Sequence, residues 1–291
     1  MEQRDIIILD SAMGTELQSR GMDISLPLWS AKPLIDNPDS VRQIHIDNVD
    51  AGADIITTNT FRTQKRTLQK AKYKFEKMDY SETAKKLTES AVRIAKDAVT
   101  ITEKDVLIAG SIAPLEDCYH PELVPDDEAL KNEHSEHYNN LVSEEVDIIL
   151  AETLSSIREI SAVLKILSNG EKEFCFSLLC KNEISLFSGE SLEDAVKLVN
   201  SYSPSALLIN CIHPSLAISV ISHLKDLADL PLGIYANVGN PKDLAGSFVE
   251  KTVSVNEYFE YAKNWKKLGV KMIGGCCGTS PEYIKKISVL K

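Results

Sequence analysis

Short runs of β-branched and aliphatic residues alternate with longer amphipathic segments along the whole chain. Such apolar runs are typical of parallel strands that are buried on both faces, and the amphipathic segments between them are typical of crossover helices. The pattern predicts eight strands, at residues 6–10, 54–58, 106–111, 147–151, 174–179, 206–210, 232–236 and 271–274.

Helices are expected between and after these strands, at residues 39–51, 81–99, 127–145, 156–167, 192–199, 216–228, 255–268 and 281–289. Three of them begin with residues suited to a helix N-terminus. Asn37 and Asp39 flank a proline at the start of the helix predicted at residues 39–51. Ser191 stands before the helix predicted at residues 192–199, and Ser280 stands before the one at residues 281–289.

Eight strand and helix pairs in strict alternation predict an α/β fold, a (β/α)8 TIM-type barrel that forms a single domain over residues 1–291. The length agrees, because such a barrel takes about 250 residues. The alternative is an open doubly wound sheet, which would need a glycine-rich phosphate loop after the first strand. Residues 10–15 (DSAMGT) follow that strand and lack the required spacing.

Composition narrows the range of partners. The formal net charge of −11 argues against nucleic acid and anionic membranes, because the field of the whole molecule repels phosphate. We therefore expect small-molecule substrates, with no nucleic-acid or membrane partner. Residues 1–5 do not begin a secretory signal, and six cysteines without one indicate reduced thiols in a cytoplasmic protein.

Chemically reactive side chains collect where the predicted strands end, which is the working face of a (β/α)8 barrel. Cysteines follow two of these strands, and carboxylates end two others. Polar residues follow several strands, so the barrel mouth is expected to combine thiols, carboxylates, amides and hydroxyls. The residues in these positions include Asp10, Thr58, Ser111, Glu152, Asn210, Cys211, Asn237, Cys276 and Cys277.

The most conspicuous of these positions is the adjacent pair Cys276 and Cys277, framed by glycines in residues 273–279 (IGGCCGT). Neighbouring side chains on a strand point to opposite faces, so two thiols converge only where the backbone leaves strand geometry. Glycine permits that departure. The alternative is a pair of small buried residues in a glycine-rich turn.

Cys211 favours a metal site, because its strand lies two strands from the Cys276–Cys277 pair around the predicted barrel. Three thiolates select soft ions such as zinc, and three protein ligands leave a fourth tetrahedral position open for catalysis. His213 is a weaker candidate ligand, because with Pro214 it is better suited to cap the next helix.

The remaining cysteines and histidines carry no such pattern. Cys175 and Cys180 are interpreted as buried strand-end or core residues. Cys118, in the long connection over residues 113–126, is expected to be a possible exposed thiol. Solvated or packed faces of amphipathic helices, away from the barrel mouth, explain four histidines: His45, His134, His137 and His223.

Asp10 and Glu152 form the second chemical group at the predicted mouth. A pair of carboxylates can serve as general acid and base, or it can bind a substrate ammonium group. The absence of a positioned histidine favours the ammonium interpretation. For Glu152 an ion pair that closes the barrel end is a further alternative.

Several motifs in order resemble the homocysteine S-methyltransferase family. They are residues 274–279 (GGCCGT), the Asn210–Cys211 strand end, residues 10–17 (DSAMGTEL), residues 51–61 (AGADIITTNTF) and residues 152–153 (ET). The resemblance covers nearly the whole chain. It implies a zinc-dependent barrel enzyme that methylates the thiol of homocysteine to give methionine.

For individual residues, the resemblance implies that Cys211, Cys276 and Cys277 hold Zn²⁺ while Asp10 and Glu152 receive the homocysteine amino group. Further substrate-binding positions are expected at Thr58, Asn210 and Asn237. Residues 27–32 (PLWSAK) resemble members that use a sulfonium donor, S-methylmethionine or S-adenosylmethionine. Betaine, a folate or a corrinoid partner protein are the alternative sources of the methyl group, and a homo-oligomer is a further possibility.

Two departures from the family pattern bear on the shape of the barrel mouth. Ser11 stands where the family usually has glycine, and Leu208 and Ile209 stand where it has glycine and a small residue before Asn210. Two other functions remain open: a thiol redox or metal-buffering protein, and a noncatalytic barrel that binds homocysteine or methionine. Neither explains why carboxylates and cysteines share one rim.

Overall fold

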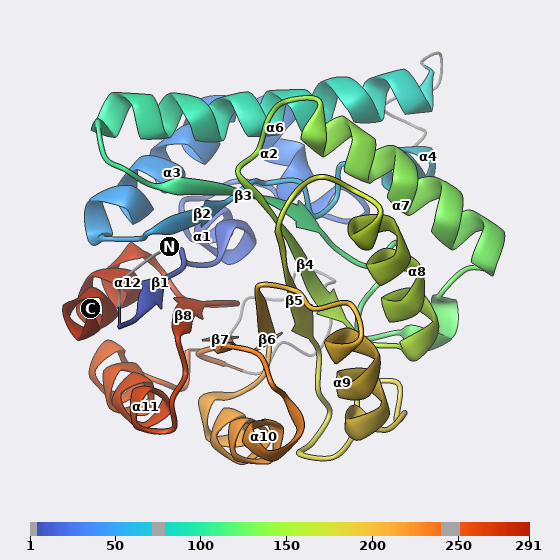
Figure 1. Ribbon diagram of the computed structural model, residues 1–291. Coiled ribbons are helices and arrows are strands. Elements are labelled where there is room, and N and C mark those ends of the chain that lie inside the picture. The colour runs from blue at the N-terminus through green and yellow to red at the C-terminus, as the bar shows by residue number, and fades with distance from the viewer. Residues whose placement is uncertain (1–4, 72–78, 240–250) are drawn as a thin grey trace.

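The barrel is built from short parallel strands. The computed structural model describes residues 5–71, 79–239 and 251–291, and these contain eight strands in one sheet, ordered β1-β8-β7-β6-β5-β4-β3-β2. Pairing of Leu9 with Ile55 joins the two edge strands, so the sheet closes into a barrel surrounded by helices (Figure 1). The strands are Ile7–Ile8 (β1), Ile55–Thr57 (β2), Leu107–Ile112 (β3), Ile148–Leu154 (β4), Phe174–Leu178 (β5), Ala206–Asn210 (β6), Leu232–Ala236 (β7) and Met272–Gly275 (β8).

Helices cover the outside of this barrel. They are Met13–Ser19 (α1), Lys32–Asp36 (α2), Pro38–Ala51 (α3), Lys65–Lys70 (α4), Tyr80–Thr102 (α6), Asp127–Val142 (α7), Ile157–Ser168 (α8), Leu192–Asn200 (α9), Pro214–Leu227 (α10), Val255–Lys267 (α11) and Pro281–Ile287 (α12). The predicted (β/α)8 barrel is confirmed, and the open doubly wound sheet is wrong. All eight predicted helices are present. The additional α1, α2 and α4 have too few residues to show a helical period in the sequence.

Side-chain caps fix where several helices begin. The Asn37 side chain accepts from the Ser40 N–H (3.3 Å), and Ser191 accepts from Asp194 (3.2 Å), as their positions predicted. Ser280 makes no side-chain cap hydrogen bond, so its predicted capping role is wrong. Each satisfied N–H is one that the first turn of a helix leaves without a partner.

Two apolar layers hold the barrel together, because successive strand residues point to opposite faces. In β6, Leu208 points into the barrel with Leu150 and Met272, whereas Leu207 and Ile209 belong to the layer between strands and helices. All are almost fully buried. The interior of the barrel is therefore a packed core, and only its mouth is left for chemistry.

Leu208 fills the barrel interior opposite a glycine. It pairs with Gly233 of β7, where an added Cβ would lie 2.6 Å from Leu208 Cγ and 3.0 Å from Met272 Cβ. Leu208, which is bulkier than the residue usual in the family, is thus accommodated by Gly233. Leu208 lies two residues before Asn210, the last residue of β6. Leu208 does not line the cavity at the mouth.

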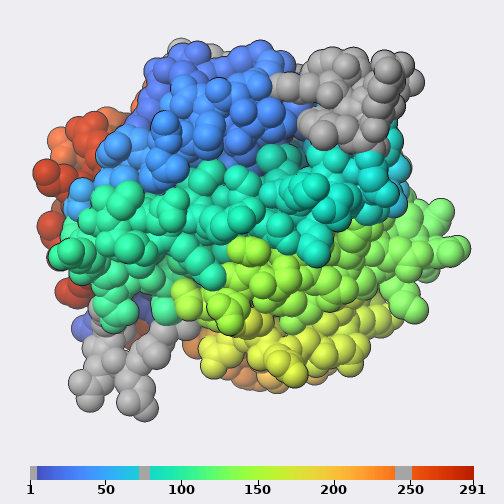
Figure 2. All heavy atoms as spheres, turned by 90° about the horizontal axis from the view of Figure 1, so that it is seen from above, coloured from blue at the N-terminus to red at the C-terminus, as the bar shows by residue number. Residues whose placement is uncertain are grey.

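Long helices form a continuous outer layer on one side. Figure 2 shows the blue, cyan and green parts of the chain, which include α3, α6 and α7, packed side by side over the barrel.

At the opposite end from the mouth, Lys291 Nζ pairs with Asp54 Oδ1 (2.6 Å), and Asp54 Oδ2 accepts from the Ile8 N–H (2.8 Å). Among the described residues, no helix has the length and apolarity needed to cross a membrane.

The contact between Gly233 and Leu208 gives a stability prediction. Gly233→Ala is expected to lower the free energy of unfolding by about 1–3 kcal/mol, because overpacking forces neighbouring side chains to move. Chemical denaturation of the purified variant measures the loss. In Gly233→Ala combined with Leu208→Ala the two losses should not add, because the smaller residue 208 makes room for the new methyl group. Additive losses would contradict the contact.

Candidate active site and metal centre

A cavity of about 780 Å³, including its open mouth, lies at the carboxyl ends of the strands. Its walls come from residues at the ends of β1, β2, β4, β6, β7 and β8 and from the connection after β3. The cavity therefore lies where a (β/α)8 barrel places its chemistry. It contains most of the sequence-predicted site residues, namely Asp10, Thr58, Glu152, Cys211, Cys276 and Cys277.

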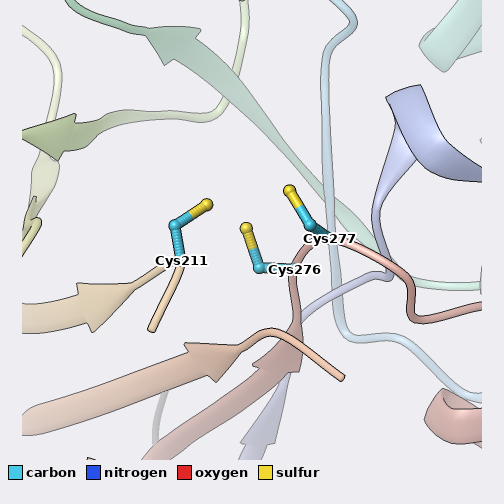
Figure 3. A group of neighbouring side chains, drawn as sticks. All are labelled: Cys211, Cys276 and Cys277. Atoms are coloured by element: carbon cyan, nitrogen blue, oxygen red, sulfur yellow. The ribbon is translucent and has the colours of Figure 1, made fainter. Parts of the chain in front are cut away.

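Three sulfur atoms converge in this cavity. The Sγ atoms of Cys211, Cys276 and Cys277 all lie within 4.8 Å of one another. Figure 3 shows them turned toward one space, with Cys211 at the end of β6 and the pair in the connection after β8. Among the described cysteine, histidine, aspartate and glutamate residues, these three cysteines form the group that could hold one metal ion. The distances suit a soft ion bound by thiolates.

The backbone fixes the positions of the three thiols. Cys211 has φ of 55°, in the left-handed region that only a few residues other than glycine adopt. The Cys276 N–H donates to the Ala236 carbonyl (2.9 Å), and the Val238 N–H donates to the Cys277 carbonyl (3.0 Å). Because such strained residues persist only where surrounding structure holds them, the β6, β7 and β8 ends act as one support.

The glycines before the cysteine pair allow close packing. A Cβ on Gly274 would lie 2.5 Å from Leu9 Cβ, and one on Gly275 would lie 2.3 Å from Thr279 Oγ1. Both glycines lie near or within β8, so they do not release the chain from strand geometry as the sequence suggested. Gly278, with φ of 83°, makes the turn after the pair.

The three thiols affect one another's pKa. Hydrogen bonds from Cys211 and Cys276 lower the pKa of the Cys277 thiol, whereas hydrogen bonding to Cys276 and Cys277, followed by burial, raises the pKa of Cys211. A cation placed between the sulfurs would favour the ionised form of all three, because it neutralises their mutual repulsion.

Asp10 lies at the end of β1 and faces the cavity. Its Oδ2 accepts from the Thr57 N–H (2.7 Å) and its Oδ1 accepts from Thr57 Oγ1 (3.1 Å). Burial raises the pKa of Asp10 to about 7, the two Thr57 hydrogen bonds oppose that shift, and the charge of Glu152 adds to it. The carboxyl is held in place and costs free energy to ionise without a cationic partner.

Glu152 occupies the neighbouring wall, within β4. Ser111 Oγ donates to its Oε1, and Tyr235 Oη donates to its Oε2 at 3.4 Å. Burial raises the pKa of Glu152 to about 7. In the part of the chain that the structure describes, no ion pair involves Asp10 or Glu152, and Glu152 is held by the hydroxyl groups of Ser111 and Tyr235 instead.

The other three predicted substrate-binding residues differ in position. Thr58 lines the cavity, where its Oγ1 accepts from the Ser111 N–H at 3.1 Å. Asn210 is fully buried below the cavity, and its side chain binds Thr153 through both the backbone N–H (3.1 Å) and the hydroxyl (2.8 Å). Asn237 is buried and does not line the cavity.

Asn210 supports the wall that carries Glu152. Thr153, the residue it binds, has φ of 63°, which is unfavourable for a β-branched side chain. Ser177 Oγ also donates to Asn210 Oδ1 (2.7 Å). The amide of Asn210 therefore offsets local backbone strain next to the carboxylate, and its role is to position the wall.

Cys118 was predicted to be a possible exposed thiol, and that prediction is wrong. The side chain is 2% exposed, and burial raises its pKa above the usual range. The connection after β3 folds over the barrel mouth, which brings Cys118 into the wall of the same cavity. Cys175 and Cys180 are buried core residues, as predicted.

The histidines do not contribute metal ligands. His213 accepts from the Ser215 N–H (3.3 Å) and caps α10, as predicted. His45, His134 and His137 are packed on helices. His137 is not remote from the mouth, however, because its Nε2 lies 3.1 Å from the Ser111 carbonyl oxygen, directly behind the donor to Glu152.

Aromatic residues also line the cavity, and two of them, Trp29 and Phe61, lie in the stretches at residues 27–32 and 51–61 that resemble the family. Trp29 and Phe61 pack edge to face with ring centroids 5.3 Å apart, and both line the cavity. Tyr119 lines it from the connection after β3. That connection contains Pro114, Pro121 and Pro125 and is long for a loop between a strand and a helix. Ser11, the departure after Asp10, also lines the cavity with a buried hydroxyl that has no partner among the described residues.

Comparisons with known proteins identify relatives over nearly the whole chain. A family model described as homocysteine S-methyltransferase matches residues 7–290. A homocysteine S-methyltransferase of Escherichia coli (strain K12) is 31% identical, covering 98% of this chain and 94% of the relative. A selenocysteine Se-methyltransferase of Brassica oleracea var. italica is 28% identical over 96% of this chain and 87% of its own.

A solved structure is similar over the whole length. The metallated form of the Escherichia coli homocysteine methyltransferase MmuM superposes with a TM-score of 0.85 at 29% identity, covering 100% of this chain and 98% of that chain. Fold, cavity and family match thus coincide over the same residues. The chain belongs to the homocysteine S-methyltransferase family.

Proposed function

We propose that this protein transfers a methyl group to the thiol of L-homocysteine and gives methionine, with zinc held by Cys211, Cys276 and Cys277. The observation that carries the proposal is the convergence of three thiols and two carboxyls, Asp10 and Glu152, in one cavity. An acceptor substrate with both a thiol and an ammonium group matches this cavity, because its sulfur suits the cysteine cluster and its ammonium group suits the two carboxyls.

The residues at the sulfur cluster fit zinc. Three cysteine sulfurs within 4.8 Å of one another supply three tetrahedral ligands and leave the fourth position facing the cavity. Coordination of the homocysteine sulfur to the ion would deprotonate a thiol whose pKa is ordinarily near 8.5 and leave it nucleophilic. A general base is then not required for the thiol.

Asp10 and Glu152 bind the ammonium group of the substrate in this proposal. Their raised pKa values mean that each carboxyl gains from a cation that enters the cavity, because pairing offsets the cost of burying the charge. Thr57, Ser111 and Tyr235 hold the two carboxyls in place before substrate arrives. Because the carboxyls are already held in place, less entropy is lost when the bound homocysteine sulfur is aligned for methyl transfer.

The methyl donor is a sulfonium in this proposal, S-methylmethionine or S-adenosylmethionine. The carbon–sulfur bond of the donor breaks and its electron pair stays on the donor sulfur, while a carbon–sulfur bond forms to homocysteine. The ring of Trp29 lines the cavity and suits a cationic donor, because aromatic rings attract cations, whereas Arg62 already lies over the ring of Phe61, 5.4 Å from its centroid. Assays that compare the two sulfoniums with betaine, methylated folate and a methylated corrinoid protein would identify the donor. Selenocysteine belongs in the matching acceptor panel.

Thiol redox or metal buffering is the competing function. It uses the three cysteines and gives no role to Asp10 or Glu152. The hydrogen bonds that hold these two carboxyls in the cavity would then have no function. A noncatalytic barrel that binds homocysteine or methionine would show affinity without turnover. The proposed enzyme and these alternatives differ in whether methionine accumulates.

Removal of one sulfur tests the metal. Cys276→Ala is expected to reduce bound zinc from about one ion per chain to a small fraction, and to abolish methionine formation, because two thiolates hold zinc weakly. Metal analysis and a homocysteine plus S-methylmethionine assay measure both. The matched control Cys180→Ala deletes a buried thiol outside the cavity and should keep both properties. Full zinc and turnover in Cys276→Ala would overturn the proposal.

Neutralising a carboxyl tests the ammonium site. Asp10→Asn is expected to raise the KM for homocysteine about ten- to hundredfold, because a charge-assisted hydrogen bond is lost, while zinc content stays the same. Steady-state kinetics at saturating donor give the value. Asp226→Asn, on the exposed face of α10, is the control for a lost surface charge. An unchanged KM would remove Asp10 from the amine site.

The raised pKa values give a prediction for pH. Below pH 7 the two carboxyls take up protons and no longer attract an ammonium group. The affinity for methionine, which has the amine and no thiol to ionise, should therefore rise about ten- to hundredfold between pH 6 and pH 8. Calorimetric titration measures it. The Asp10→Asn, Glu152→Gln double variant should lose the dependence, and a flat profile in the unmodified protein would contradict the assignment.

A further inference from the structure

Tyr119 brings an unused hydroxyl to the metal centre. The residue as a whole is half-buried, yet its hydroxyl oxygen is buried and has no hydrogen-bond partner among the described residues. The exposed part of the side chain is thus the ring, and the hydroxyl end points inward. Because Tyr119 lines the cavity that holds Cys211, Cys276 and Cys277, its hydroxyl is buried in the wall of that cavity.

The ring is held firmly from two sides. Tyr119 packs edge to face on Phe187, with ring centroids 5.3 Å apart and an interplanar angle of 76°. Its N–H donates to Asp117 Oδ1 (3.0 Å), and the next residue, His120, donates its N–H to the Asp117 carbonyl (2.9 Å). This turn and the ring contact fix the direction of the hydroxyl without using it.

Four cysteines line the same cavity as Tyr119, namely Cys118, Cys211, Cys276 and Cys277. Burial raises the pKa of Tyr119 above its usual range, and the next contributions come from the charges of Cys211, Cys277, Cys118 and Cys276. A tyrosine hydroxyl has an ordinary pKa near 10, so it is protonated at neutral pH and acts as a hydrogen-bond donor. A buried donor without an acceptor is unfavourable in a folded protein, so a ligand that brings an acceptor to this point gains from it.

We propose that the Tyr119 hydroxyl donates a hydrogen bond to the thiolate sulfur of the bound acceptor substrate and thereby positions it for methyl transfer. The inference rests on the proposed function, because that function brings a fourth sulfur to the cluster. The three cysteine sulfurs already face one another, whereas the substrate sulfur arrives on the cavity side, where the hydroxyl lies.

The hydrogen bond distinguishes substrate from product. A thiolate is a charged acceptor and forms a strong hydrogen bond, whereas the thioether sulfur of methionine is a weak acceptor. Tyr119 therefore favours homocysteine over methionine, and methylation removes the acceptor. Loss of this contact after transfer helps methionine to leave. The ammonium and carboxylate groups, which both ligands share, play no part in this preference.

The test compares two ligands in two proteins at pH 8. Tyr119→Phe removes only the hydroxyl and keeps the ring against Phe187. Calorimetry should show homocysteine affinity about ten- to hundredfold weaker than in the unmodified metal-loaded protein, with methionine affinity unchanged. In cobalt-substituted protein, the sulfur-to-metal absorption band should differ between the two proteins only after homocysteine is added. Tyr261→Phe, on the outer helix α11 and outside the cavity lining, is the matched control and should resemble the unmodified protein.

Other outcomes overturn the inference in different ways. Equal weakening of homocysteine and methionine would assign the hydroxyl to the shared carboxylate. No weakening of either ligand, or a cobalt band that already differs before homocysteine is added, would give Tyr119 no role toward the substrate sulfur. If the unmodified metal-loaded protein binds no homocysteine, the proposed function and this inference both fail. Homocysteine binding by the unmodified protein therefore distinguishes failure of the proposed function from failure of the Tyr119 inference alone.

Discussion

The site depends on one constraint: the ends of β6 and β8 must lie close enough for their cysteines to share a point. Strand β7 lies between them, and its register pairs Asn210 with Tyr235 and Tyr235 with Gly274. A slip of one residue would turn the side chains of a strand to the opposite face. The packed barrel interior prevents that slip, since Leu208 fits only beside Gly233.

Preparing this site has a cost that the rest of the fold offsets. Cys211 and Thr153 both adopt left-handed backbone conformations, and two carboxyls face a cavity instead of water. Asn210 holds Thr153 with two hydrogen bonds, and Thr57 holds Asp10 with two more. Local strain of this kind is typical of functional sites in which a scaffold fixes reactive groups before the ligand arrives.

The electrostatics of the cavity favour a cationic group next to a soft metal. Burial raises the pKa of each carboxyl to about 7, and no cation in the part of the chain that the structure describes pairs with either of them. The thiols are close enough to repel one another once ionised. Both sets of groups are therefore stabilised by positive charge from outside the chain. This shared requirement explains why thiols and carboxyls lie in one cavity, which neither redox nor metal-buffering chemistry needs.

The sequence by itself determined the barrel, because eight buried strands and their helices each carry a local periodicity, and it determined which residues stand at strand ends. It therefore predicted the convergence of Cys211 with the pair at Cys276. Only the tertiary structure decided the rest, because long connections and packing partners have no local period. The connection after β3 buries Cys118 and brings Tyr119 to the cavity. Of the glycines beside the cysteine pair, Gly278 makes the turn, whereas Gly274 and Gly275 make room for Leu9 and Thr279.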